Sequence, residues 1–284
     1  MSGLVPRHEA WRCAYRSDRY MSGLNDGELD LRFADVMTNS TILKDEGKIG
    51  IGQILWMEKF AHLQEELGSR GRELPPADSL GTRLITPPAE KSALGESVRK
   101  QVGGPVPSAF TLFKYGNLQH LKSLHFGGHL RLFPASHYND PSLNAAVADS
   151  ELTFEKIRGS TRTRYRQKSD FYCFCSSWLH RERLIFDFSA TAVLVVTDPL
   201  EFFLRLATAL NRTSFDVRFN GVTYVDPLLL EDKDLTDLRF VKHMRFAYQT
   251  EHRWVATPPK PMGRLEVVQI CLGPLTDISV LHGA

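Results

Sequence analysis

Residues 246–256 read FAYQTEHRWVA, and they predict the entrance to a buried strand, HRWVA at residues 252–256, with polar side chains placed on one face. Successive side chains of a strand point to opposite faces, so Gln249, Glu251 and Arg253 are expected on the same side. A Gln and a Glu two residues apart can both face one cleft, and Arg253 would lie close enough to hold the carboxylate. The alternative is an edge strand whose Glu pairs with a neighbouring Arg at the protein surface.

The segments on either side of this strand predict an α+β fold with a central mixed or antiparallel sheet. Short apolar or aromatic runs are typical of buried strands, and they occur at residues 110–115, 129–133, 171–177, 191–197 and 265–272. The chain lacks the regular βαβα alternation and the Gly-rich first turn that a dinucleotide-binding Rossmann unit requires.

Residue types that favour helix starts, helix ends and turns lie between these strands. An N-cap residue precedes each of three predicted helices, and two of the caps are followed by proline, a favoured first helical residue. The caps are Asn117, Asp140 and Asp198. Gly127 and Gly128 would end the first of these helices, and Asn220–Gly221 predicts a two-residue hairpin turn.

Residues 1–105 differ from the rest and predict a mainly helical N-terminal region. Apolar residues recur at helical spacing between Lys48 and Arg70, and Gly68 would end that helix. Residues 70–107 are rich in Pro, Gly and Ser, which is typical of an irregular connection. We therefore expect residues 1–105 to be a helical region with a linker and residues 106–284 to form an α+β catalytic domain. The role of the first region, including any partner, stays open.

Composition narrows the class of protein. The formal net charge of +2 is too small to imply a nucleic-acid or membrane partner by itself. Four cysteines are too few for a disulfide scaffold, and no apolar run approaches the ~18 residues that span a bilayer. We therefore expect a cytoplasmic protein without a membrane partner. Four histidines match no metal-ligand spacing, so no metal site is expected; they are His120, His125, His129 and His137.

Residues 156–168 form a basic stretch that contains a tyrosine and no acidic residue. Arginines beside an aromatic side chain can grip RNA, single-stranded DNA or another phosphate-bearing surface. The alternative is a solvated loop. The residues expected to contact nucleic acid are Arg158, Arg162, Arg164, Tyr165, Arg166 and Lys168.

Four short motifs, in order, resemble an uncharacterised bacterial domain family, some members of which are linked to abortive phage defence. They are Lys114-Tyr115, Tyr138-Asn139-Asp140-Pro141, Cys173-Phe174-Cys175-Ser176 and the strand that contains Gln249, Glu251 and Arg253. The resemblance covers roughly residues 108–272, and the family usually has Glu at the position of Gln249. It implies a toxin or defence effector.

The Gln-x-Glu pair late in a small α+β domain is also similar to the catalytic strand of ADP-ribosyltransferases. This resemblance implies a split β core, NAD as the substrate, Glu251 as the carboxylate at the nicotinamide ribose and Gln249 as an acceptor-side residue. The implied NAD-binding residues are Lys114, Tyr115, Tyr138, Asn139, Ser176 and Arg253. Asn-Asp-Pro is equally a turn signature that needs no ligand, and strand tyrosines are often core residues.

Elementary electrostatics, without any resemblance, explains how a glutamate could promote cleavage of NAD. Cleavage of the nicotinamide–ribose bond creates a cation, and a glutamate with an ordinary pKa of ~4.3 is ionised at neutral pH. At ~4 Å and an effective dielectric constant of ~20, a carboxylate stabilises a unit cation by about 4 kcal/mol, or roughly a thousandfold in rate. We therefore expect an NAD-dependent ADP-ribosyltransferase-like enzyme that modifies a nucleic acid or a protein. The alternatives are an NAD glycohydrolase with the same glutamate and a non-catalytic sensor that binds nucleic acid or another partner.

Overall fold

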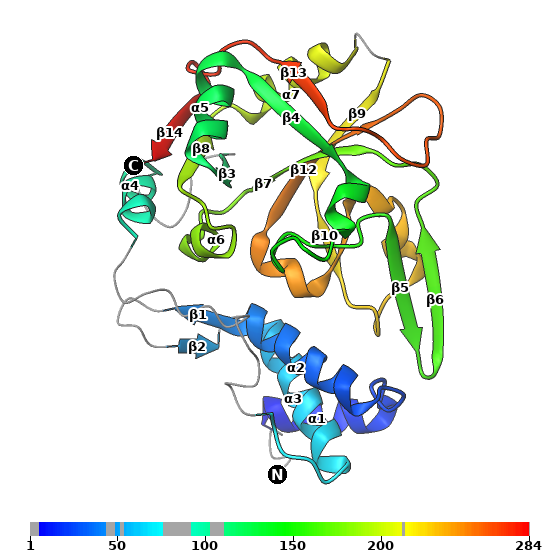
Figure 1. Cartoon of the computed structure of the whole chain (residues 1–284). Helices are drawn as coiled ribbons and strands as arrows, with labels where there is room; N and C mark the ends of the chain where they lie inside the picture. Colours follow the sequence, from blue (N-terminus) through cyan, green and yellow to red (C-terminus); the bar gives the residue numbers. More distant parts are fainter. Residues whose placement is uncertain are drawn as a thin grey trace.

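The computed structural model describes residues 6–43, 49–51, 54–75, 92–102, 111–211 and 214–283 (Figure 1). Its helices are α1 (Arg7–Asp18), α2 (Asp26–Ser40), α3 (Ile54–Ser69), α4 (Ala93–Val102), α5 (Leu118–Gly127), α6 (Glu182–Asp187) and α7 (Pro199–Asn211). Short 3₁₀ helices are η2 (Ala135–Asn139), η3 (Asp232–Leu235), η4 (Leu238–Phe240) and η5 (Met244–Gln249). No helix in this part of the chain is long and apolar enough to cross a membrane.

The strands confirm the predicted α+β class. They are β1 (Thr41–Leu43), β2 (Ile49–Ile51), β3 (Leu112–Gly116), β4 (His129–Pro134), β5 (Thr153–Arg158), β6 (Thr161–Arg166), β7 (Tyr172–Ser177), β8 (Ala192–Val196), β9 (Asp216–Gly221), β10 (Thr223–Val225), β11 (Val241–His243), β12 (Glu251–Thr257), β13 (Val268–Cys271) and β14 (Ser279–Gly283). The large sheet has eight strands in the order β13-β4-β7-β3-β8-β14, with β12 on β7 and β9 on β12. Its pairings are antiparallel.

Strand β7 is the centre of this sheet, because three other strands pair with it. Along one edge it pairs with β12, from Glu251↔Ser177 to Ala256↔Tyr172. On the other edge, β4 pairs with Tyr172 and Cys173, while β3 pairs with Ser177 only. The sheet therefore splits between β3 and β4 beside the middle of β7.

Two apolar layers hold this sheet. On one face, α5 and α7 cover a cluster that includes Phe174, Trp254 and Phe202. On the other face, α4 and α6 contribute Val98 and Leu184 to a second cluster around β3 and β8. Because both faces are covered, β8 is buried over its whole length, which explains its unbroken apolar sequence AVLVV.

Several local predictions are confirmed. The Asn117 side chain accepts a hydrogen bond from the Gln119 backbone N–H at 2.9 Å at the start of α5, and Gly128 ends that helix in the left-handed conformation with φ 68°. The Asp198 side chain likewise accepts from the Glu201 N–H at 3.0 Å where α7 begins. Caps and apolar runs are local signals, so the sequence carries them directly.

Two other local predictions are wrong. Asp140 starts no helix: its side chain accepts from the Ser142 N–H at 2.8 Å, and turns follow because the segment has no apolar helical stripe to bury. Asn220–Gly221 makes no hairpin, since β9 pairs with β12 and the following β10 pairs in parallel with β11.

The N-terminal helices α1, α2 and α3 enclose their own apolar cluster around Tyr15, Leu29 and Leu63. Ile54 and Leu55, two of the apolar residues at helical spacing that were expected to form the buried stripe of α3, are exposed, while Trp56 is buried. Within the stretch expected to be irregular, α4 forms and packs against β8 and β14, so it lies with the sheet although a boundary near residue 105 was expected. The rest of that stretch, residues 76–91 and 103–107, lies outside the described residues.

Candidate functional site

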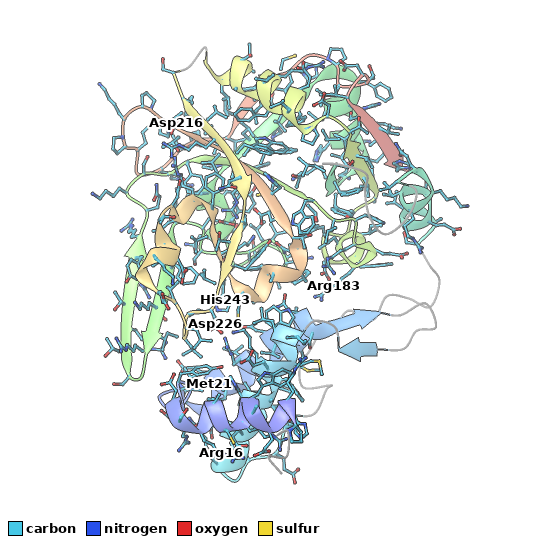
Figure 2. The ribbon with its side chains drawn as sticks, turned by 180° about the vertical axis from the view of Figure 1, so that it is seen from behind. Arg16, Met21, Arg183, Asp216, Asp226 and His243 are labelled. Atoms are coloured by element: carbon cyan, nitrogen blue, oxygen red, sulfur yellow. The ribbon has the colours of Figure 1, made fainter. Side chains whose placement is uncertain are left out.

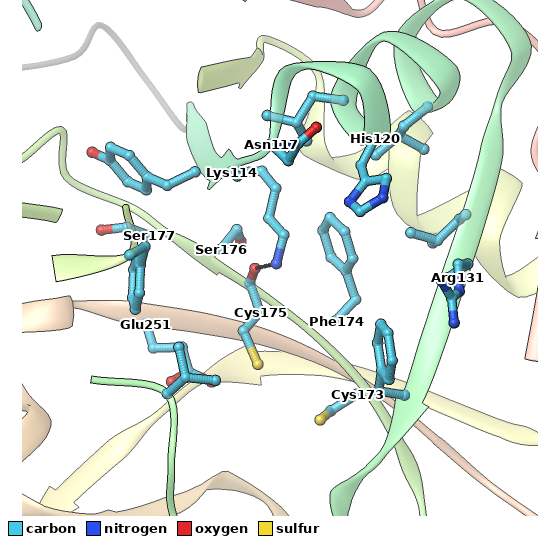
Figure 3. Close-up of a pocket in the computed structure, with 18 of the residues that line it drawn as sticks. Lys114, Asn117, His120, Arg131, Cys173, Phe174, Cys175, Ser176, Ser177 and Glu251 are labelled. Carbon is cyan, nitrogen blue, oxygen red and sulfur yellow. Dashed lines mark hydrogen bonds between the residues drawn. The ribbon is translucent and has the colours of Figure 1, made fainter. Parts of the chain in front are cut away.

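A cavity of about 870 Å³ lies where the sheet splits (Figure 3). It exists because β3 and β4 separate beside β7 and leave the backbone at Cys175 without a strand on that side. The Lys114 ammonium, which comes from β3, donates to the Cys175 carbonyl oxygen at 2.8 Å and so replaces a strand partner there. The cavity brings together six predicted site residues: Lys114, Tyr115, Tyr138, Ser176, Gln249 and Glu251.

Gln249 and Glu251 reach the cavity by a different backbone path from the predicted one. Gln249 ends the 3₁₀ helix η5, Thr250 is left-handed with φ 46°, and only Glu251 begins the strand β12. A β-branched residue in the left-handed region is strained. The Thr250 and Ser177 hydroxyls lie 2.7 Å apart and hydrogen-bond, which helps to hold this turn. The prediction of one continuous strand is therefore wrong, although both side chains line the cavity.

Glu251 is buried, with only 5% of the residue exposed, and both of its oxygens contact cations. Arg253 Nε donates to Oε1 at 2.7 Å, and Lys242 Nζ donates to Oε2 at 3.0 Å. Burial opposes ionisation, but the charges of Arg253 and Lys242 outweigh it and hold the pKa of Glu251 well below its ordinary value. Glu251 is therefore an ionised carboxylate in the cavity wall at neutral pH.

Arg253 and Asn139 are not among the residues that line the cavity. The Arg253 guanidinium is fully buried, and besides Glu251 it donates to Glu151 at 2.7 and 3.1 Å and to the Arg239 carbonyl at 2.8 Å. This arrangement orients Glu251 and leaves Arg253 no path to a ligand. Asn139 is exposed and accepts from the Ser150 hydroxyl at 3.1 Å.

Three charged residues beside Glu251 were not predicted from the sequence. Lys242 lies 3.5 Å from Glu151 and 3.9 Å from Asp149, and its ammonium sits 4.5 Å from the centre of the Phe246 ring. Burial and the neighbouring Glu151 raise the pKa of Asp149 to about 6. The one sequence signal was a lysine close to the apolar residues Phe240, Val241 and Met244; no motif links it to residues almost a hundred positions earlier.

A second, more cationic part of the cavity lies across β7 from Glu251. Lys114, His120 and Arg131 come from β3, α5 and β4 and lie around this part in Figure 3. His129 and His137 also line the cavity, whereas His125 is a buried residue of α5 whose Nδ1 lies 2.9 Å from the Ser279 hydroxyl. Among the described residues, no group of three or more His, Cys, Asp or Glu side chains is arranged to hold a metal ion.

Most of the basic stretch belongs to a two-stranded hairpin, β5–β6, rather than to a loop. Figure 1 shows it extending beside the N-terminal helices, and its arginines do not line the cavity. Arg162 pairs with Glu28 and, at 3.2 Å, with Glu155, while Arg164 lies 3.7 Å from Glu155. Arg158, Arg166 and Lys168 are exposed and have no ion pair within the described part of the chain.

His180, which holds the Tyr115 side chain, gives the stability a pH dependence. Its Nδ1 lies 3.0 Å from the Tyr115 hydroxyl, and burial lowers the pKa of His180 to about 4. A histidine in an unfolded chain has a pKa of about 6.5, so only the unfolded form binds this proton between those values. We expect the free energy of unfolding to fall by about 3 kcal/mol from this group as the pH drops from about 6.5 to 4.

Urea denaturation at several pH values measures how the free energy of unfolding changes with pH. The variant His180→Asn isolates the part that comes from His180, because asparagine does not titrate. Asp149 acts in the opposite direction: its pKa of about 6 lies above that of an unfolded aspartate, so its contribution is lost as the pH rises towards 6. The difference between the wild type and the variant removes that background. Equal slopes in both proteins would contradict the role assigned to His180.

Comparison of this chain with protein-family models, curated proteins and solved structures finds no match.

Proposed function

We propose that the chain binds NAD in the cavity at the sheet split, cleaves the nicotinamide–ribose bond and transfers ADP-ribose to an acceptor. The observation that carries this proposal is an ionised carboxylate, Glu251, in the wall of a cavity of about 870 Å³. That volume lies within the range of small-molecule and cofactor sites. The cations Lys114 and Arg131, together with the imidazole of His120, lie on the other side of β7 and suit the diphosphate of a dinucleotide.

In the reaction, the bond between the ribose carbon and the nicotinamide nitrogen breaks, and its electron pair leaves with nicotinamide. The acceptor nucleophile then bonds to that carbon and loses a proton. Glu251 stabilises the ribose cation by short-range attraction and by accepting from a ribose hydroxyl. Arg253 and Lys242 offset part of its charge, so its contribution stays below the ~4 kcal/mol of an unpaired carboxylate.

Gln249 suits a role on the acceptor side. Its Nε2 donates to the Ala146 carbonyl at 2.7 Å, and its Oε1 lies 3.4 Å from Lys242 Nζ, so the amide is fixed beside Glu251 at the cavity wall. Water in place of the acceptor would give NAD hydrolysis with the same glutamate.

One observation favours a second candidate, a non-catalytic sensor that binds its ligand in the same cavity. Both Glu251 oxygens are already paired, and a carboxylate paired with two cations is a common structural device. A role in defence or toxicity follows from the resemblance to the phage-defence domain family alone.

Incubation of the full chain with labelled NAD separates these functions. Nicotinamide release without label on RNA, DNA or protein indicates hydrolysis, and label on one of these acceptors indicates transfer. A ligand-induced rise in the unfolding temperature without either product favours the sensor. Absence of both binding and turnover contradicts the proposed function.

We further propose that the acceptor is a single-stranded nucleic acid that contacts the β5–β6 hairpin. Residues 153–168 contain six Lys or Arg and one Glu, a local charge of +5, whereas the rest of the chain sums to −3. On β6, arginines at alternate positions share one face and repeat about every 6.8 Å, which suits successive phosphates of an extended strand.

Substitution of the unpaired cations is expected to reduce the salt dependence of RNA or single-stranded DNA binding. Arg166→Gln and Lys168→Gln should each lower the slope of log affinity against log salt by about 0.7, because each phosphate contact on a single strand releases counterions. Fluorescence anisotropy between low and high salt measures this slope. Lys122→Gln, an exposed lysine on α5, is the control and should leave the slope unchanged. No binding at low salt would exclude nucleic acid and favour a protein acceptor.

A further inference from the structure

The N-terminal helices contact the segment that leads directly into Gln249 and Glu251. That segment is η5, and α2 packs along it. Figure 2 shows Asp226, His243 and Arg183 at the boundary between the N-terminal helices and the rest of the chain. The side of η5 that faces away from the cavity is therefore covered by a region to which the sequence assigned no role.

Asn39, near the end of α2, binds the backbone of η5 at two points. Its Oδ1 accepts from the Tyr248 N–H at 2.8 Å, and its Nδ2 donates to the Arg245 carbonyl at 3.0 Å. The same Nδ2 also donates to the Asp35 carbonyl at 2.8 Å, within α2 itself. One amide side chain thus connects the backbone of α2 to the two backbone groups of η5.

Residues of α6, α2 and α3 make a second set of contacts with η5. Arg183 donates to the Thr38 carbonyl at 2.5 Å, and its guanidinium lies 3.9 Å from the centre of the Tyr248 ring. Met244, at the start of η5, is buried against Val36 and Trp56. Polar and apolar contacts from the N-terminal helices therefore reach both ends of η5.

The position of η5 affects the site because the C-terminal end of η5 leads directly to Gln249 and Glu251. Gln249 is its last residue, and Thr250, which connects it to Glu251, is in the strained left-handed conformation. Strain of this kind persists only where the surrounding structure holds it. Movement of η5 would shift Gln249 relative to Glu251 and Lys242, because a single residue separates the first two.

We infer that α2 supports the site from outside the cavity and that Asn39 is a positioning residue for Gln249 and Glu251. The catalytic consequence rests on the proposed function. The structural consequence, that α2 holds η5, does not depend on it. Asn39 touches neither ligand nor reacting atoms and acts through the backbone of Tyr248 and Arg245.

Hydrogen exchange of the full chain, followed by mass spectrometry, tests this inference without a substrate. Asn39→Leu removes all the hydrogen bonds of the side chain, and we expect exchange at residues 244–251 to accelerate about tenfold or more, while exchange in β8 changes little. Val36→Ala, which trims the α2 side chain that packs against Met244 of η5, is expected to accelerate exchange at the same residues, so the test remains usable if one variant fails to fold.

Asn25→Leu is the matched control, because Asn25 is the same residue type at the opposite end of α2. Its Oδ1 accepts from the Glu28 N–H at 3.0 Å and caps the helix, far from η5 along the chain. If Asn25→Leu accelerates exchange at 244–251 as much as Asn39→Leu, or if Asn39→Leu has no effect there, the inference is overturned.

Steady-state kinetics with NAD add the catalytic readout. Asn39→Leu is expected to lower kcat for nicotinamide release at least about tenfold and to change KM less than about threefold, because the displaced groups act in the transition state. A rise in KM with kcat unchanged overturns the catalytic part. If the wild type cleaves no NAD but the exchange result is as expected, the hold of α2 on η5 stands and the proposed function fails.

Discussion

Glu251→Gln is expected to reduce nicotinamide release from NAD by roughly a hundredfold. The substitution keeps the shape of the side chain and removes the charge that faces the ribose cation, a difference of about 3 kcal/mol in the transition state, which is less than for an unpaired carboxylate because Arg253 and Lys242 offset part of the charge. Steady-state release of labelled nicotinamide measures the change. The effect should appear in kcat, since the charge on the ribose develops only as the bond breaks.

The same substitution is also expected to lower stability, so turnover needs a control for unfolding. Arg253 and Lys242 would lose a buried anionic partner, which typically costs about 3–5 kcal/mol. Glu66→Gln is the matched control: Glu66 is a fully buried glutamate between α1 and α3, it pairs with Arg19 and Arg70, and it is absent from the cavity lining. Glu66→Gln should lose stability and keep kcat; equal turnover in Glu251→Gln and the wild type would end the proposed function.

Arg253→Leu is expected to be among the most destabilising single substitutions in the chain, with a loss of about 3–5 kcal/mol in the free energy of unfolding. The fully buried guanidinium pairs with both Glu251 and Glu151 and also satisfies the Arg239 carbonyl. Without it, two carboxylates stay buried with Lys242 as their remaining close cation. Urea denaturation at neutral pH measures the loss.

A surface arginine of similar connectivity provides the comparison. Arg205 also pairs with two carboxylates, those of Glu201 and Asp277, but all three side chains are partly exposed. Arg205→Leu should cost less than about 1 kcal/mol, because water screens exposed pairs. The loss in Arg253→Leu should shrink at low pH, where Glu251, whose pKa Arg253 helps to hold low in the wild type, takes up a proton in the variant. Equal losses in the two variants would show that the buried cluster around Arg253 contributes no more than a surface pair.

The elements that the sequence predicted well are those whose signals are local. The buried strands β3, β4, β7 and β8 are short apolar or aromatic runs, and α5 and α7 start at side-chain caps. The strand β12 was predicted from the same kind of run. Gln249 was wrongly placed on this strand, because the left-handed Thr250 that separates η5 from β12 is fixed by a contact with Ser177, 73 positions earlier.

The features of the candidate site likewise fall into those that local sequence predicts and those that depend on tertiary packing. The sequence by itself determined that Glu251 and Arg253 share a strand face and lie close enough to pair, because alternation along a strand depends on the backbone alone. Only the tertiary structure decided that Lys242 and Glu151 join them, that β3 and β4 part beside Cys175 to form the cavity, and that α2 holds η5. These features depend on which distant segments pack together, and such packing is set by the summed burial and hydrogen bonding of the whole chain.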